Sequence, residues 1–118
     1  MKFVPIAFMT TALVASSGAA SAQQAQTFDH LHDKARVGSQ ICMTDHWHYG
    51  EGGPFKDRRV AERQAMKRWS EFTAMEYGAA WGRFESSAGR RIDCKTSSDG
   101  GTTLYTCGAH GRPCRPAS

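Results

Sequence analysis

The sequence contains few of the aliphatic residues from which hydrophobic cores are built. After residue 22, a stretch of 96 residues holds only ten Leu, Ile, Val or Phe. They are Phe28, Leu31, Val37, Ile41, Phe55, Val60, Phe72, Phe84, Ile92 and Leu104. This share is roughly half the level below which composition suggests disorder, so it excludes a large core and a second domain. Three Trp, three Tyr and four Cys offset part of the deficit, because aromatic rings bury large areas and cross-links stabilise short chains.

The sequence also lacks the short motifs that mark common enzyme classes. It contains no G-x-S-x-G, no H-E-x-x-H and no phosphate-binding G-x-x-x-x-G-K-[ST] pattern. His46 beside Asp45 supplies an acid and base pair, but a thin core leaves little room for a shaped catalytic pocket. We therefore expect a non-enzymatic protein, with a small hydrolase as the third interpretation after two binding functions described below.

Long hydrophobic runs are missing as well, apart from one short stretch at the N-terminus. Lys2 precedes an apolar stretch over residues 3–14, and small residues at 20–22 form a cleavage site. This pattern predicts a Sec-type signal peptide over residues 1–22 that is cleaved before Gln23, with an uncleaved anchor as the alternative. No later segment is apolar enough for a membrane helix. We expect a periplasmic or secreted protein whose fourteen basic and eleven acidic residues give a formal charge of +3 after cleavage.

Export decides how the four cysteines are interpreted. They are Cys42, Cys94, Cys107 and Cys114. An even number in an oxidising compartment predicts disulfides, whereas a zinc site is disfavoured because no C-x-x-C pair is present. Residues 90–96 and 102–109 flank turn-forming residues and are predicted to form a β-hairpin. Three pairings exist, and folding the hairpin about the bond between Gly100 and Gly101 favours Cys94 with Cys107 and Cys42 with Cys114.

One long helix is predicted from Pro54 or Asp57 to Tyr77. Its apolar stripe recurs at helical spacing and comprises Ala61, Ala65, Trp69, Phe72 and Met75. Gly78 follows as a residue that readily adopts the left-handed conformation in which helices end. Helix and hairpin together predict an α+β fold, in which one amphipathic helix packs on a small antiparallel β-meander held by two disulfides.

The segments around these elements define the domain organisation. Residues 23–40 are predicted to form a flexible N-terminal arm, in which Phe28, Leu31 and Ala35 have the spacing of a short helix. Residues 41–118 are predicted to form the small disulfide-braced domain.

Two glycine-containing segments flank the predicted helix. Residues 50–54 are rich in turn formers and predict a loop that leads into the helix. Residues 79–85 are predicted as a strand that bulges at Gly82, although Trp81 and Phe84 would also suit a helix.

Histidines occur twice in a His-x-His pattern. The two motifs are His30-Leu31-His32 and His46-Trp47-His48. In an extended segment, alternate residues project to the same side, so His46 and His48 could chelate Cu(II), Ni(II) or Zn(II) while Trp47 turns into the core. The first pair could complete the ligand shell if the arm folds back, and Asp45 or Glu51 could add an oxygen ligand. Alternatively, the imidazoles bond only backbone or water, so we expect either no cofactor or Cu or Zn.

A row of basic residues lies on the predicted helix. Arg59, Arg63 and Lys67 are spaced by four residues, so they share one face, where like charges weaken a helix. The row is either a solvated face or a site for an anionic envelope polymer or an acidic envelope protein. Nucleic acid is not expected as the partner of an exported protein.

The motifs carry a resemblance to a known group of proteins. The matching positions are Cys42, Asp45-His46-Trp47-His48-Tyr49-Gly50, Trp69, Tyr77-Gly78, Trp81, Cys94, Cys107 and Pro113-Cys114. In these positions the sequence resembles small Sec-exported four-cysteine proteins of Gram-negative bacteria that carry no assigned activity. The resemblance implies a compact disulfide-braced envelope domain and transfers no catalytic residue. The first function hypothesis is therefore a non-enzymatic binding or structural protein of the cell envelope, and the second is periplasmic transition-metal binding.

Overall fold

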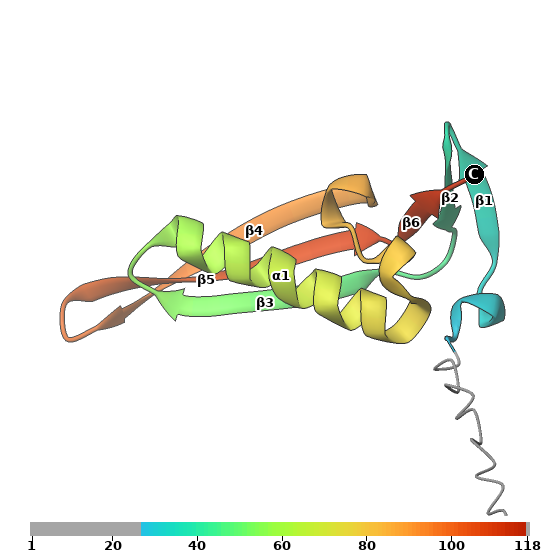
Figure 1. Cartoon of the computed structure of the whole chain (residues 1–118). Helices are drawn as coiled ribbons and strands as arrows, with labels where there is room; N and C mark the ends of the chain where they lie inside the picture. Colours follow the sequence, from blue (N-terminus) through green and yellow to red (C-terminus); the bar gives the residue numbers. More distant parts are fainter. Residues whose placement is uncertain (1–26, 118) are drawn as a thin grey trace, which may run out of the picture.

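Two antiparallel three-stranded sheets and one long helix make up the fold (Figure 1). The structure is a computed structural model and describes residues 27–117. The predicted signal peptide and its cleavage site lie outside the described residues. The small sheet contains β1 (Lys34–Val37), β2 (Gln40–Met43) and β6 (Cys114–Pro116) in the order β1-β2-β6. The large sheet contains β3 (His48–Phe55), β4 (Ala88–Asp99) and β5 (Thr102–Arg112) in the order β3-β5-β4.

The helix α1 (Arg58–Tyr77) lies along the large sheet (Figure 1). Strands β3 and β4 both run antiparallel to β5, which separates them, and α1 is part of the connection from β3 to β4. Small 3-10 turns follow the helix at η2 (Ala79–Trp81) and η3 (Phe84–Ser86), and another, η1 (Asp29–Leu31), precedes β1. The predicted α+β class is confirmed, and the two sheets form more than a simple meander.

Local signals set both ends of α1, and a strict row of buried residues sets its orientation. The Asp57 side chain accepts a hydrogen bond of 2.8 Å from the backbone N–H of Arg59, and Gly78 ends the helix with a φ of 107°. The buried residues recur every four positions, at Ala61, Ala65, Trp69, Thr73 and Tyr77. The predicted stripe is therefore wrong at Phe72 and Met75, which are 43% and 74% exposed. The helix meets the sheet along one narrow row rather than along a broad apolar face.

Glycines in β3 let this row approach the sheet backbone. A Cβ atom at Gly50 would overlap the backbone of Ala65 and Trp69, and one at Gly52 would overlap the backbone of Ala61 and Ala65. The prediction of a loop over residues 50–54 is wrong, because these glycines belong to a strand that a helix covers closely. Their neighbours Tyr49 and Glu51 point to the exposed face of the same strand.

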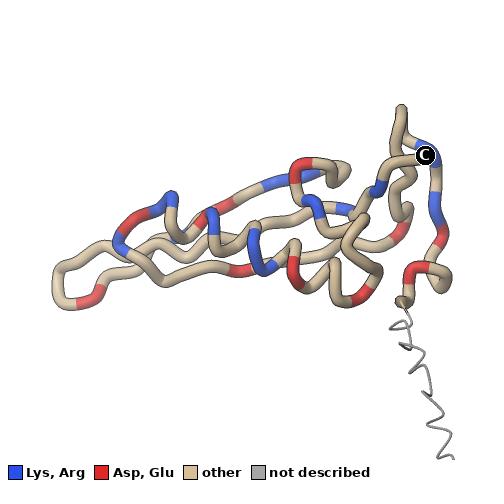
Figure 2. Tube along the Cα trace, in the orientation of Figure 1, with Lys and Arg blue, Asp and Glu red and all other residues tan. Residues whose placement is uncertain are grey.

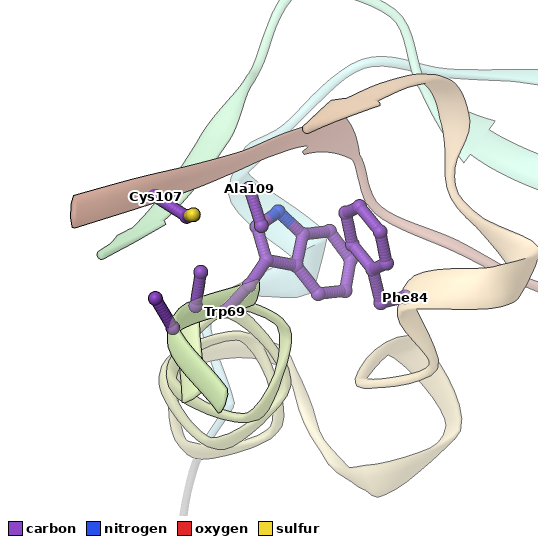
Figure 3. Close-up of a cluster of buried hydrophobic side chains, with 6 residues drawn as sticks. Trp69, Phe84, Cys107 and Ala109 are labelled. Atoms are coloured by element: carbon purple, nitrogen blue, oxygen red, sulfur yellow. The ribbon is translucent and has the colours of Figure 1, made fainter. Parts of the chain in front are cut away.

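The main core forms between α1 and the large sheet (Figure 3). Trp69 is fully buried, and its ring meets the edge of Phe84 at a centroid distance of 5.3 Å. Cys107 and Ala109 of β5 cover the same cluster from the sheet. The Trp69 indole N–H donates a hydrogen bond of 3.1 Å to the backbone oxygen of His48. One large aromatic side chain therefore supplies much of the core that the sparse aliphatic residues do not.

Both predicted disulfides are confirmed. Cys94 and Cys107 face each other in the β4–β5 register, and Cys42 and Cys114 face each other between β2 and β6. The hairpin is longer than predicted, because its strands extend to the two-residue turn at Gly100 and Gly101. The second bridge joins the strand that precedes β3 to the end of the described chain, 72 residues away.

Two predicted elements are corrected by the structure. The predicted strand over residues 79–85 is replaced by two 3-10 turns, η2 and η3, because Trp81 and Phe84 bury their rings in two different clusters: Trp81 packs with Met43 and Tyr77, and Phe84 packs with Trp69. The short helix predicted around Phe28 and Leu31 is reduced to η1, and both side chains are exposed. Within the predicted arm, residues 34–37 pair with β2 as strand β1.

The close contact between α1 and β3 gives the first prediction. We expect Gly50→Ala to lower the free energy of unfolding by about 2 kcal/mol or more, because overpacking a rigid interface costs about 1–3 kcal/mol and the added methyl meets backbone rather than a flexible side chain. Urea titration followed by circular dichroism measures the change. Glu51→Ala on the exposed side of the same strand is the control and should stay within about 0.5 kcal/mol of the parent. Equal stability of the two variants would contradict the close approach.

Candidate metal centre

Three segments that are distant in the sequence bring ligand-type side chains together near the C-terminal end of α1. His32 follows η1, His46 lies between β2 and β3, and Glu76 belongs to the last turn of α1. One ligand atom of each residue lies within 4.8 Å of the others. The rings of His32 and His46 are 4.4 Å apart between centroids. All three side chains are partly exposed, so the group is accessible from solvent.

Backbone hydrogen bonds hold the N-terminal segment against the helix end. The Phe28 N–H donates to the Glu76 carbonyl oxygen at 2.9 Å. The Thr44 N–H donates to the Asp33 carbonyl oxygen at 3.1 Å, which fixes the chain on the other side of His32. The first bond uses one of the carbonyl groups that a helix leaves without an internal partner at its C-terminus. His32 is therefore positioned by main-chain contacts on both sides.

A fourth histidine lies beside this group in the protein interior. His48 begins β3 and is only 2% exposed. Its Nδ1 atom lies 2.7 Å from Oγ1 of Thr73, and its Nε2 atom lies 3.2 Å from the Tyr77 hydroxyl and 3.3 Å from Oε2 of Glu76. The Tyr77 ring stacks on the His48 ring at 4.9 Å, with an interplanar angle of 23°. The Tyr77 hydroxyl also lies 3.2 Å from Nε2 of His32, so it connects the inner and outer histidines.

Burial controls the protonation of both inner side chains. Burial is the largest influence on the pKa of His48 and lowers it to about 4. The negative charge of Glu76 opposes this shift by raising the pKa, and the neighbouring His46 and His32 lower it further. Burial and the nearby Glu76 raise the pKa of the Tyr77 phenol well above its ordinary value. At neutral pH the centre therefore contains a neutral His48 imidazole and a protonated phenol.

The structure assembles only part of the predicted ligand set. His32, His46 and His48 come together, and the rings of His46 and His48 lie 5.0 Å apart. His30 does not join them: its ring nitrogen lies 3.1 Å from the Thr27 carbonyl oxygen on the exposed surface. Glu51 is occupied elsewhere, because its carboxylate accepts a hydrogen bond of 2.8 Å from the Tyr49 hydroxyl.

The prediction that Trp47 turns into the core is wrong. Its side chain is 56% exposed, and the guanidinium of Arg112 lies 5.5 Å from its ring centroid. Gly89 lies beside this indole: its φ of 62° favours glycine, and an added Cβ would lie 2.7 Å from the outer edge of the ring. The residue that the sequence interpretation missed is Glu76. In the sequence, Glu76 is marked only by its place beside Tyr77, one helical turn after Phe72. Its closeness to His32 becomes visible only when the structure places the N-terminal segment against the end of α1.

A second group, formed by Glu62, Cys94 and Cys107, lies within the same 4.8 Å limit. Its two sulfur atoms form a disulfide, so they cannot act as thiolate ligands. The histidine group is therefore the better candidate for a metal.

Arg59, Arg63 and Lys67 are exposed, and Figure 2 shows that α1 carries both basic and acidic residues along its length. Lys67 pairs with Glu71 at 3.7 Å, and the neighbouring Arg58 pairs with Glu62 at 3.0 Å. Within residues 27–117, neither Arg59 nor Arg63 has an acidic partner within ion-pair distance. The structure therefore locates the row but does not test whether it binds an anionic partner, which stays a prediction.

Comparison with known proteins gives no match. No protein family, no curated protein and no solved structure matches this chain. Among residues 27–117, no helix is long and apolar enough to cross a membrane.

The lowered pKa of His48 predicts a pH dependence of the metal-free protein. Below about pH 6.5 the unfolded chain protonates this histidine, whereas the folded protein keeps it neutral down to about pH 4. The unfolded state then binds more protons, so the free energy of unfolding should fall as the pH is lowered through this window. Urea titrations with a chelator at several pH values measure the slope.

Two variants identify the source of that slope. His48→Gln should be less stable at pH 7 but should lose part of the pH dependence. His30→Gln removes an exposed histidine and should keep the parent slope. If His48→Gln retained the full slope, other groups would be responsible for it.

Proposed function

We propose that this protein is an exported, non-enzymatic protein of the cell envelope that binds one transition-metal ion of the zinc and copper class. The observation that carries the proposal is the convergence of His32, His46 and Glu76 from three separate segments to within 4.8 Å. Imidazole nitrogen is a preferred ligand of Zn and Cu, and a carboxylate commonly accompanies it. The two disulfides support the exported location, since such bonds persist in oxidising compartments.

Electrostatic surroundings support a cation at this position. Glu76 contributes a carboxylate, and two partly exposed imidazoles beside it offer lone pairs when neutral. The outer groups are accessible to solvent, which gives an ion a route of entry. The inner wall consists of buried aromatic and histidine side chains, which exclude water from the far side.

Metal titration of the disulfide-intact protein tests this function. We expect one equivalent of Zn(II) or Cu(II) to bind, as measured by calorimetry or by competition with a chromophoric chelator. His32→Ala, His46→Ala and Glu76→Gln should each weaken binding more than about 100-fold, since even groups that only orient metal ligands contribute about 10- to 100-fold.

The chain offers matched controls for each ligand. His30→Ala removes a histidine two residues from His32, and Glu71→Gln removes an exposed carboxylate from the same helix. Both should bind as the parent does. If the parent binds no metal, or if the controls and the ligand variants lose affinity alike, the proposed function is wrong.

We keep an anionic envelope polymer or acidic envelope protein as a partner hypothesis, supported by the exposed positions of Arg59 and Arg63. The triple variant Arg59→Gln, Arg63→Gln, Lys67→Gln should lose salt-dependent sedimentation with purified cell wall or lipopolysaccharide, because exposed charges act over about 8 Å at physiological ionic strength. A variant with Lys34, Arg36 and Lys95 changed to Gln removes the same charge elsewhere on the surface. Equal sedimentation of the two variants would show that the row is ordinary solvated surface.

A further inference from the structure

The large sheet has one face that α1 covers and one that it does not. The covered face carries Gly50 and Ala109, which the register places opposite each other. Side chains alternate along a strand, so the neighbouring residues form the other side, here called the open face. Its side chains are Tyr49 and Glu51 of β3, Thr106 and His110 of β5, and Arg91, Asp93 and Lys95 of β4. Those on β3 and β4 are exposed.

Two half-exposed aromatic rings lie on the open face. Tyr49 is 49% exposed, and Trp47, which lines a hollow of this face together with Arg91, is 56% exposed. An added Cβ at Gly108 would lie 2.6 Å from Cε2 of Tyr49. One at Gly89 would lie 2.7 Å from Cη2 of Trp47. Both rings therefore lie close to the strand backbone, at positions that side chains on these glycines would obstruct.

Polar groups beside the rings are held in place by one another. The Tyr49 hydroxyl donates a hydrogen bond of 2.8 Å to the Glu51 carboxylate. Oδ2 of Asp93 lies 3.3 Å from Nε of Arg91 and 3.3 Å from Nε2 of His110. The open face thus presents aromatic rings and positioned hydrogen-bonding groups side by side, which is the composition of a site for a ligand that is both polar and ring-shaped.

Two hollows lie along the rings. One, of about 310 Å³, is lined by Trp47, Gly89, Arg91 and His110. The other, of about 290 Å³, is lined by residues that include Tyr49, Asp93, Lys95 and Thr106. Both volumes are near the lower end of the range of ligand sites, about 300–1,000 Å³. Because Asp93 of the second hollow contacts Arg91 and His110 of the first, the two are neighbouring parts of one surface.

The charges on this surface restrict the class of ligand. On β3 and β4, the cations Arg91 and Lys95 are balanced by the carboxylates of Glu51 and Asp93. A polyanion such as nucleic acid would meet both carboxylates, and the cores of protein interfaces are depleted of charged residues. An uncharged sugar meets neither objection. Its hydroxyl groups donate to carboxylates and accept from cations, and its C–H groups pack on the electron-rich faces of aromatic rings.

We propose that the open face is a binding site for an uncharged β-1,4-linked polysaccharide, with sugar units packed on Trp47 and Tyr49 and hydroxyl groups bonded to Glu51, Asp93 and Arg91. The flat sheet favours a chain that is itself flat and extended, as β-1,4-linked chains are. Residues two positions apart in an extended segment are separated by about 6.6 Å, so one chain can contact both rings. The inference goes beyond the proposed function and uses none of the metal-centre residues His32, His46 and Glu76.

Tryptophan fluorescence of the disulfide-intact protein tests the proposal, because Trp69 and Trp81 are buried and Trp47 is exposed. At millimolar concentration, cellohexaose or chitohexaose should shift the emission to shorter wavelength and protect it from quenching by acrylamide. The affinity should change less than about twofold between about 50 and 500 mM NaCl, because the ligand is uncharged. Maltohexaose is the matched control, since it has the composition of cellohexaose but a coiled α-1,4-linked chain, and it should bind at least about tenfold more weakly.

Substitutions assign the binding to the two rings. Trp47→Ala and Tyr49→Ala should each weaken sugar binding at least about tenfold, as measured by calorimetry, whereas Tyr49→Phe keeps the ring and should bind within about threefold of the parent. Phe28→Ala is the matched control: it removes an exposed ring from another surface and should bind as the parent does. Circular dichroism should give the parent spectrum for all four variants, because the substituted side chains are exposed.

The outcomes are separate from those of the metal titration, because the sugar measurements are made with a chelator present. Absence of binding by both β-linked hexasaccharides overturns the glycan site, and so does equal binding of maltohexaose. If the sugars bind but Trp47→Ala and Tyr49→Ala bind as Phe28→Ala does, the open face is not the site. Protection of Trp47 by single-stranded oligothymidylate, with a steep salt dependence and without protection by the sugars, would identify a polyanion site instead.

Discussion

The direct contact between α1 and the backbone of β3 is the constraint on which the rest of the structure depends. Gly50 and Gly52 allow the helix backbone to lie where side chains would otherwise stand. The four-residue row that this contact selects continues through Trp69 to Thr73 and Tyr77. The same row that makes the core therefore delivers a hydroxyl and a phenol to His48 at the start of β3. In a protein with so few aliphatic residues, close backbone packing replaces bulky side chains as the source of a defined helix position.

Features that depend on local register were predictable from the sequence. The turn at Gly100 and Gly101 fixes the hairpin, and the hairpin register places Cys94 opposite Cys107. The helix was predictable because its cap and its terminal glycine are adjacent to it in sequence. Strand β3 was not, since a glycine-rich strand has the composition of a loop. Only the alternation of glycines at 50 and 52 with exposed residues at 49 and 51 distinguishes this strand from a loop. The alternation indicates a strand only once it is known that a helix covers the glycine face.

The candidate centre shows the same division between local and tertiary information. The spacing of His46 and His48 placed both on one side, as predicted, but the prediction assigned the wrong neighbour to the core. Burial of His48 rather than Trp47 follows from the position of Thr73 and Tyr77, which the sequence alone cannot place beside β3. Glu76 was not predicted because its partner His32 lies 44 positions earlier and reaches it through the β1–β2 pairing and the bond from Phe28.

The disulfides and the proposed metal would stabilise different parts of the molecule. Cys42 and Cys114 join β2 to β6, so the segment that carries His46 is anchored on one side by a covalent bond and on the other by β3. The ligands are thus gathered by a fold with its own core, unlike a zinc finger, which is unfolded without its metal. An ion bound at this centre would add stability according to its concentration relative to its dissociation constant. The ion would mainly stabilise the position of the residues around His32. No disulfide joins these residues to the rest of the fold, and their exposed side chains Phe28 and Leu31 add little to the core.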